Sequence, residues 1–421
     1  MSRLIISNAA LHGRVGTWDL TILEDRVVEI VPHDPQWPIR QTEETLEAAG
    51  GLLGRAFAEP HIHPDKSYSL GDLPDGVDVT ALDSSDTFLR AARIKAGFTA
   101  ENVERRARRA FELALRNGVT QLRATADVDS LAGIRGVEGL LRAREAMASV
   151  MDIEIVAFPQ EGLQRDPGTL PLLREALALG VDAIGGWPNV EADSAAECAH
   201  VSTVFDLAAE FDVDIDIHAD CFLDPAERAL EVIAKETIQR GYQGRVLASH
   251  CAALELYEPA DAARVIDLVA RAGITIAVIP LNLAHGGPRG LSRPQQLLDA
   301  GVTVVAGSDN MNDGWYPLGT LNPLDRATMT FLGGSFHTES DVDVVWNMIT
   351  GGASGGARAS APDVVEGQRA DLVLHTARSR TEALEHPLSG LVTIHRGRVV
   401  ARRSVTDHWF AGASPSAGAG S

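Results

Sequence analysis

Two histidines two positions apart, followed along the chain by a third histidine and an aspartate, are the residues best suited to bind a metal ion. His61 and His63 lie in AEPHIHPDK, His218 lies near the end of VDIDIHAD, and Asp309 follows VTVVAGS. In an extended strand, residues two apart face the same side, so both imidazoles of the pair can reach one ion. Three histidines and a carboxylate, with one position left for water, suit Zn²⁺ or Fe²⁺. We therefore expect one divalent metal ion at these four residues.

The middle of the chain alternates strand-like runs with amphipathic, helix-like segments at a spacing of about 30–40 residues. Segment 101–118 reads as a helix and ends in glycine, as do segments 170–180 and 264–273. Polar residues gather at the carboxyl ends of successive strands, which is where barrel enzymes keep their chemistry. This favours a (β/α)8 TIM-type barrel over a doubly wound sheet. The expected strands are residues 118–127, 152–161, 181–188, 213–220, 245–252, 274–282 and 302–310.

The two ends of the chain have a different texture, with short runs rich in β-branched residues separated by Gly, Asp or Pro. We expect one small β-sandwich built from both ends. Its predicted parts are residues 1–54 and 366–410, and the barrel takes residues 55–365. The small-residue stretch 411–421 is expected to be a disordered tail.

The composition excludes several kinds of partner. The 421 residues carry a formal net charge of −21, which disfavours nucleic-acid polymers and anionic membranes. No apolar run approaches the roughly 20 residues of a membrane span, and the amino terminus lacks the pattern of a secretory signal. Three cysteines without CxxC spacing indicate a reducing compartment. We expect a cytoplasmic homo-oligomeric enzyme that acts on a small molecule.

The order of these segments resembles the amidohydrolase superfamily, and within it the cytosine deaminase branch. The resemblance spans most of the chain and rests on five segments: EPHIHPDK, VAFPQEGL, DIDIHAD, ASHCA and GSDNMNDGWYPLGT. It implies that His61, His63, His218 and Asp309 are the metal ligands. It further implies that His250 orients the attacking water and stabilises the tetrahedral oxyanion.

The resemblance also assigns residues to the substrate. Gln160 matches the glutamine that hydrogen-bonds the ring amide, and Trp315 lies in the WYPLG segment near the pocket wall. The strand that ends near Gln160 offers no lysine that could be carbamylated to bridge two ions, so a mononuclear centre is expected.

Two positions depart from the cytosine deaminase pattern. The branch has a proton-carrying glutamate three residues after the third histidine, where this chain has Cys221, and a second aspartate where it has Asn310. An unperturbed cysteine has a pKa of about 8.5 and does not replace a carboxylate as a proton carrier. Losing such a group typically lowers the rate by about 10²- to 10⁴-fold. Asp220 or Asp309 are the nearest carboxylates that could take over the proton. Both changes also remove negative charge, which favours a substrate that is less cationic or is itself anionic.

Three hypotheses about function follow. The first is a metal-dependent hydrolase that acts on a C–N bond of a small cyclic nitrogen compound, by deamination of a cytosine-like heterocycle. The second is a cyclic amide or imide hydrolase in which Asp309 alone carries the proton. The third is a barrel that has lost its catalytic activity and keeps its metal as a structural or ligand-binding element.

Some polar residues are given no chemical role from the sequence. Glu191 follows a strand end, where a site role and a structural role are equally expected. His200, His337, His375 and His408 have no polar neighbours of the kind described and are expected on the surface or on helices.

Overall fold

The alternating middle of the chain forms a parallel barrel, in a computed structural model that describes residues 3–35, 44–72, 87–280, 291–351, 363–406 and 408. Its strands are hydrogen-bonded in chain order. The first and last strands meet where His63 N donates to Asp309 O (2.9 Å) and Asp309 N donates to His61 O (2.8 Å). The strands are β6 (Phe57–Ile62), β7 (Val119–Asp127), β8 (Asp152–Phe158), β9 (Ala183–Gly186), β10 (Asp214–Ala219), β11 (Val246–His250), β12 (Thr275–Val278) and β13 (Thr303–Ala306).

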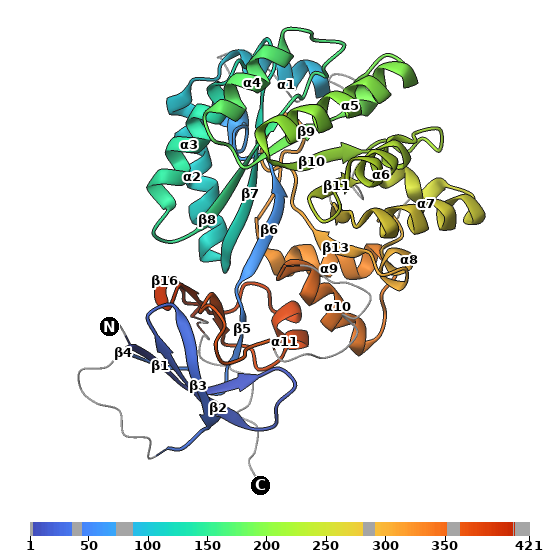
Figure 1. The fold of residues 1–421 in the computed structure, drawn as a ribbon. Helices are drawn as coiled ribbons and strands as arrows, with labels where there is room; N and C mark the ends of the chain where they lie inside the picture. The colour runs from blue at the N-terminus through green and yellow to red at the C-terminus, as the bar shows by residue number, and fades with distance from the viewer. Residues whose placement is uncertain are drawn as a thin grey trace.

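Helices surround this barrel, as Figure 1 shows. Their local signals are those expected from the sequence: Thr99 and Asn102 form a capping box at the start of α2, and Gly273 ends α7 in the left-handed conformation (φ 60°). The helices are α1 (Thr87–Ala96), α2 (Ala100–Arg116), α3 (Arg135–Met147), α4 (Thr169–Ala178), α5 (Ser194–Phe211), α6 (Ala229–Arg240), α7 (Pro259–Ala272), α8 (Pro294–Asp299), α9 (Pro323–Gly333), α10 (Glu339–Ile349) and α11 (Arg380–Glu385).

Strands from both ends of the chain form a second, mixed sheet in the order β16-β15-β14-β5-β1-β2-β3, with β4 paired to β1. This sheet lies beside the barrel in Figure 1. It has its own apolar core, and Thr393 Oγ1 donates to Leu115 O of α2 (2.9 Å), which joins it to the barrel. The strands are β1 (Arg3–Leu11), β2 (Thr17–Leu23), β3 (Arg26–Pro32), β4 (Glu44–Glu47), β5 (Leu52–Arg55), β14 (Leu372–His375), β15 (Leu391–His395) and β16 (Arg398–Arg403).

The structure confirms the predicted TIM-type barrel with a small β-domain assembled from both termini. Each predicted barrel strand overlaps one of β7 to β13. The boundaries after residue 54 and before residue 366 stay predictions, and the predicted tail, residues 411–421, lies outside the described residues. None of the helices that the structure describes combines the length and apolar character needed to cross a membrane.

Candidate metal centre

The four predicted metal ligands meet at the carboxyl end of the barrel. Ligand atoms of His61, His63, His218 and Asp309 all lie within 4.8 Å of one another, and all four residues are buried. Nε2 of His63 is 3.4 Å from Nε2 of His218 and 3.3 Å from Oδ1 of Asp309. Nε2 of His61 lies 3.8 Å from the same carboxylate oxygen. Residues from β6, β10 and the loop after β13 therefore converge on one point.

Two carboxylates lie near the Nδ1 atoms of His61 and His63. Oδ1 of Asp216 is 3.3 Å from Nδ1 of His61, and Oδ1 of Asp127 is 3.8 Å from Nδ1 of His63. The carboxylate of Asp216 favours a proton on Nδ1 of His61 and leaves a lone pair on Nε2, as in a carboxylate–histidine–metal triad, whereas Asp127 is too far from His63 for a hydrogen bond and acts on that ring through its charge. The Nε2 atoms of His61 and His63 point, with Asp309 Oδ1, at a common centre. Acceptors that converge without a donor between them fit a bound cation.

The electrostatics of the cluster also favour a cation. Burial and the ammonium of Lys66 lower the pKa of His63 to about 4. Burial also lowers the pKa of His218 far below its usual value, and the other histidines add to this effect. Burial opposes a proton on His61, but Asp216, Asp309 and Glu59 outweigh it and raise its pKa. The cluster thus holds two neutral imidazoles beside carboxylates that attract positive charge.

At the carboxyl ends of three barrel strands, near the cluster, the backbone adopts the left-handed conformation. Asp220, His250 and Asp309 have φ values of 48°, 69° and 64°. Non-glycine residues adopt this conformation at a cost and are found disproportionately at functional sites. The turn after β11 brings the ring centroid of His250 to 4.8 Å from that of His218 and 6.0 Å from that of His61. The structure therefore places His250 beside the cluster, as its predicted role requires.

Gln160 is tied to the cluster through a buried lysine. Lys66 Nζ donates to Asp127 Oδ1 (2.7 Å) and to Gln160 Oε1 (2.9 Å). Burial would lower the pKa of Lys66, but Asp127 and Asp65 outweigh it and raise that pKa, so the side chain is a charged ammonium. Gln160 itself is 3% exposed.

The loop after Asp309 holds Asn310 and Trp315 around one buried carboxylate. Asn310 Nδ2 donates to Asp313 Oδ2 (2.8 Å), and the backbone N–H groups of Trp315 and Tyr316 donate to Asp313 Oδ1 (both 2.9 Å). Burial raises the pKa of Asp313 to about 6, so it is ionised at neutral pH. The Trp315 ring packs edge-on against Phe88 of α1, with centroids 4.9 Å apart.

Cys221 lies in apolar surroundings. It packs against the buried side chains of Phe158, Trp187 and Val190. Burial raises the pKa of its thiol well above the ordinary value, and Glu227 adds to this shift. The thiol is therefore protonated at neutral pH, which fits neither a nucleophile nor a proton carrier.

Trp187 was not identified from the sequence, although it joins the aromatic surroundings of the metal cluster. Its ring lies 5.9 Å from that of His218 and stacks on Phe88, with centroids 5.7 Å apart. The signal in the sequence was a tryptophan directly after a buried strand, in GGWPN.

The carboxylate of Asp220 is occupied by hydrogen bonds at the start of a helix and does not face the metal cluster. Its carboxylate accepts from the backbone N–H groups of Ala229 (2.7 Å) and Leu230 (3.2 Å) at the start of α6. Tyr257 Oη also donates to it (3.2 Å). Of the two carboxylates considered as replacements for the missing glutamate, Asp309 is the one that faces the cluster.

Glu191 has a structural role. Of the four histidines without an assigned role, His200 lies on a helix, as expected, but is buried there, whereas His375 lies in a buried strand and was wrongly expected on the surface or on a helix. His200 is fully buried in α5, where Trp187 N donates to its Nε2 (3.0 Å) and its Nδ1 lies 2.7 Å from Glu191 Oε1. His375 is 1% exposed in β14. Both are buried because distant segments cover them, which local spacing does not reveal. His337 and His408 are exposed, as expected.

A buried ion pair closes the barrel beside the ligands. Glu59 of β6 accepts from Ser308 N (3.0 Å) and pairs with Arg326 of α9. Arg326 also donates to Ala58 O (2.8 Å), and Glu59 accepts from His61 N (3.2 Å). The network links β6, β13 and α9 at the junction that positions His61 and Asp309.

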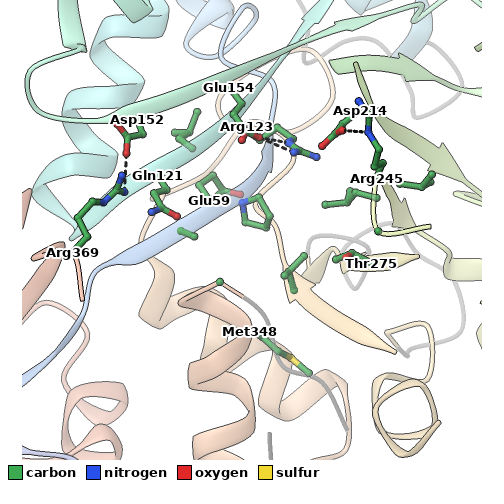
Figure 2. A pocket seen from close by; sticks show the side chains of 18 residues that line it. Glu59, Gln121, Arg123, Asp152, Glu154, Asp214, Arg245, Thr275, Met348 and Arg369 are labelled. Atoms are coloured by element: carbon green, nitrogen blue, oxygen red, sulfur yellow. Dashed lines mark hydrogen bonds and ion pairs between the residues drawn. The ribbon is translucent and has the colours of Figure 1, made fainter. Parts of the chain in front are cut away.

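A cavity of about 460 Å³ lies at the opposite, amino-terminal end of the barrel strands. Figure 2 shows its charged side chains in pairs, including Arg123 with Glu154 and Arg245 with Asp214. Arg123 Nη1 is also 3.9 Å from Asp216 Oδ2. A chain of charges therefore runs from this cavity through Asp216 to His61.

Comparisons with known proteins agree with this geometry. The amidohydrolase family model matches residues 44–401. N-isopropylammelide isopropyl amidohydrolase of Pseudomonas sp. strain ADP is 30% identical over 417 residues, which cover 96% of this chain and 98% of the relative. Pterin deaminase of Rhizobium rhizogenes strain K84 is 31% identical over 380 residues, covering 85% and 82%. The structure of 5-methylcytosine deaminase from Klebsiella pneumoniae with 5-fluorocytosine gives a TM-score of 0.87 at 27% identity, covering 96% and 99%.

The matched range includes the metal cluster and its neighbour His250. The relatives are hydrolases of C–N bonds, as their names state. The cluster of buried imidazoles and a carboxylate fits the metal dependence of such enzymes. This protein is accordingly a metal-binding hydrolase that acts on C–N bonds, and the chain belongs to the amidohydrolase family.

Proposed function

We propose that the protein removes an amino group from a small, cytosine-like heterocycle, with one divalent ion, Zn²⁺ or Fe²⁺, held by His61, His63, His218 and Asp309. The observation that carries the proposal is the convergence of these four residues beside His250. The absence of a bridging lysine on β8 supports a single ion. The cytoplasmic location and the homo-oligomeric state stay predictions.

A divalent ion at this point would lower the pKa of water from 15.7 to about 7 and so supply a nucleophile at neutral pH. Asp309 Oδ1 faces His61 and His63, so Oδ2 is the atom proposed to take the proton of the attacking water. The same oxygen returns the proton to the leaving nitrogen. His250 donates to the oxygen of the tetrahedral intermediate, which typically contributes about 3 kcal/mol. In the overall reaction, water and the amino-substituted ring give ammonia and a ring that carries an oxo group.

A second candidate reaction is release of an alkylamine in place of ammonia. The apolar contacts of Cys221 with Phe158, Trp187 and Val190 favour a leaving group that carries a hydrocarbon substituent. The relative from Pseudomonas, whose name specifies an isopropyl-substituted ring, supports the same reading.

The test is turnover of a ring panel by protein that has been stripped with a chelator and reloaded with zinc or iron. Cytosine, 5-methylcytosine, a pterin and N-alkylated triazines are incubated with each form, and ammonia, alkylamine and ring-opened product are measured. Ammonia release supports deamination and alkylamine release supports the second candidate. Ring opening without either would replace both with the cyclic amide reaction.

A His250→Asn variant is the matched control for the mechanism. Its turnover should fall by about 10²- to 10³-fold, the usual effect of losing an oxyanion donor. Its metal content should stay equal to that of the unaltered protein. A metal-loaded protein that turns over no member of the panel would instead support a barrel that has lost its catalytic activity.

A further inference from the structure

The imidazole of His250 projects from a turn with unusual backbone. His250 ends strand β11 and Cys251 follows it, and both have left-handed backbone, with φ values of 69° and 51°. Neither is a glycine, and other residues keep this conformation only where the surrounding structure holds them in it. One contact comes from the neighbouring strand β10, because Cys251 N donates to Ala219 O (2.8 Å). Further contacts come from a segment about forty residues along the chain.

Ser292 holds the start of this turn. Its Oγ donates to His250 O (2.5 Å), and the side chain is buried. The carbonyl of His250 belongs to the peptide group that joins His250 to Cys251, so the hydrogen bond fixes the plane of that peptide. Ser292 lies just before α8, in the connection from β12 to β13, whereas His250 begins the connection from β11 to β12. The hydrogen bond therefore joins two successive loops at the carboxyl end of the barrel.

Arg293, the next residue, holds the end of the turn. Its Nη2 donates to Glu255 O (3.1 Å) and to Tyr257 O (2.6 Å), and its backbone N donates to Glu255 Oε2 (3.2 Å). These acceptors lie at the end of the short 3₁₀ helix Ala252–Leu256 of the same turn. Ser292 and Arg293 are themselves left-handed, with φ values of 56° and 54°. Two consecutive residues thus hold the two ends of the turn that carries the imidazole.

We infer that Ser292 and Arg293 are positioning residues that hold the imidazole of His250 in place for C–N bond hydrolysis. The inference rests on the proposed function, which gives His250 its contact with the tetrahedral intermediate. Neither residue is among the metal ligands. Their loss should therefore lower kcat and leave the zinc affinity and KM unchanged. A displacement of about 1 Å at a reacting group can lower a rate by about 10²-fold, so the effect is large enough to measure.

The first test is kinetic and uses zinc-loaded protein with cytosine and 5-methylcytosine. Ser292→Ala should lower kcat by about 10- to 10²-fold and change KM by less than about 2-fold. Arg293→Met should lower kcat by about 10-fold, because it releases only the far end of the turn. Thr237→Val is the matched control on α6, since it also removes a hydrogen bond from a buried hydroxyl to a backbone carbonyl (Ile233 O, 2.8 Å). The control should keep the kcat of the unaltered protein.

Combination with His250→Asn separates positioning from general damage. Asparagine adopts left-handed backbone more readily than most residues, so this variant keeps the turn and removes the imidazole. Because Ser292 acts through His250, adding Ser292→Ala to His250→Asn should lower kcat by less than about 2-fold further. An equal fold-loss in both backgrounds would mean that Ser292 only stabilises the fold, and it would overturn the inference.

A measurement without substrate decides the question if neither ring is turned over. The ring ¹⁵N signals of the histidines are recorded in zinc-loaded protein, and those of His250 are identified by their loss in His250→Asn. The His250 signals should shift in Ser292→Ala, while those of His61, His63 and His218 should keep their positions. Ser292→Gly removes the same hydroxyl and adopts a φ of 56° without steric cost, so it replaces Ser292→Ala if that variant does not fold.

The outcomes distinguish this inference from the proposed function. Shifted His250 signals without ammonia release by the unaltered protein would keep the inference about the position of His250 and overturn deamination. Ammonia release with an unchanged kcat in Ser292→Ala would keep deamination and overturn the inference. Unchanged His250 signals in both Ser292 variants would also overturn it.

Discussion

Asp216 Oδ1 lies 3.3 Å from Nδ1 of His61, inside the barrel and on the side of the imidazole away from the metal cluster. The other carboxylate oxygen lies 3.9 Å from Arg123, which lines the cavity at the far end of the strands. The orientation of His61 therefore depends on Asp216 and, through it, on Arg123 at the amino-terminal end of the barrel strands. This relationship gives a first prediction, which concerns metal affinity and not turnover.

Replacing Asp216 by asparagine should weaken metal binding by about 10- to 100-fold, because the His61 imidazole loses the carboxylate that fixes its tautomer and orientation. The measurement is the zinc dissociation constant, obtained by competition with a chromogenic chelator. Asp214→Asn is the matched control, since Asp214 lies on the same strand but pairs with Arg245. Equal zinc affinity in the Asp216→Asn and control proteins would remove Asp216 from the metal centre.

A second prediction concerns the buried pair Arg326–Glu59 at the closure of the barrel. Arg326→Met should lower the free energy of unfolding by about 3–5 kcal/mol, because it leaves the Glu59 carboxylate buried without its cation. Urea unfolding should be followed on metal-free protein, so that bound metal does not add its own stabilisation.

The double variant Glu59→Gln, Arg326→Met serves as the control for that argument. It removes both charges and keeps a side chain that can accept from Ser308 N and His61 N. It should unfold at a higher urea concentration than Arg326→Met alone. If the double variant is the less stable of the two, the loss does not come from an uncompensated charge.

A third prediction concerns His375, whose ring packs against the rings of Phe57 and Trp346. Burial, with Arg403, lowers its pKa to about 3 in the folded protein, against about 6.5 unfolded. The unfolded chain therefore takes up the proton first, and stability is lost as the pH falls from about 6.5 toward 3. At pH 5 this loss amounts to about 2 kcal/mol.

Replacing His375 by phenylalanine should remove that part of the pH dependence. The difference in unfolding free energy between pH 7 and pH 5 should shrink by about 2 kcal/mol relative to the unaltered protein. His386→Gln, at an exposed position, should leave the difference unchanged. An unchanged pH dependence in the phenylalanine variant would mean that His375 is not the group that titrates.

The strands and the metal ligands could be predicted because they depend on local regularity. The period-two pattern of residues 213–220 gives both the strand and the burial of its histidine, and the HxH spacing places two imidazoles on one face. The partners of these ligands could not be predicted in the same way. Asp127 ends its own strand without a motif, and its contact with Lys66 joins residues 61 positions apart.

Burial of single histidines also escaped prediction, because it depends on which segment covers them. His200 lies on a helix whose spacing gives no hint of an inward-facing histidine. It is buried because Glu191 and the backbone of Trp187 supply one partner for each ring nitrogen. His375 has no recorded hydrogen-bond partner within the described residues and is covered by aromatic rings of other elements. Pairings of this kind depend on tertiary contacts and produce no periodic pattern in the sequence.

The last prediction concerns Cys221, which occupies the place of the proton-carrying glutamate in the cytosine deaminase pattern. The thiol is protonated and packs on Trp187, while Asp220 is committed to the start of α6. A Cys221→Glu variant would add a carboxylate beside Asp309 for proton transfer to the ring. Deamination of cytosine should rise by about 10²-fold or more if this position alone limits the reaction. Cys221→Gln introduces a side chain of the size of glutamate that does not take up or release a proton near neutral pH, so it should show no gain. A gain in both variants would indicate a change of pocket shape, and no gain in either would mean that the site is built for a ring other than cytosine.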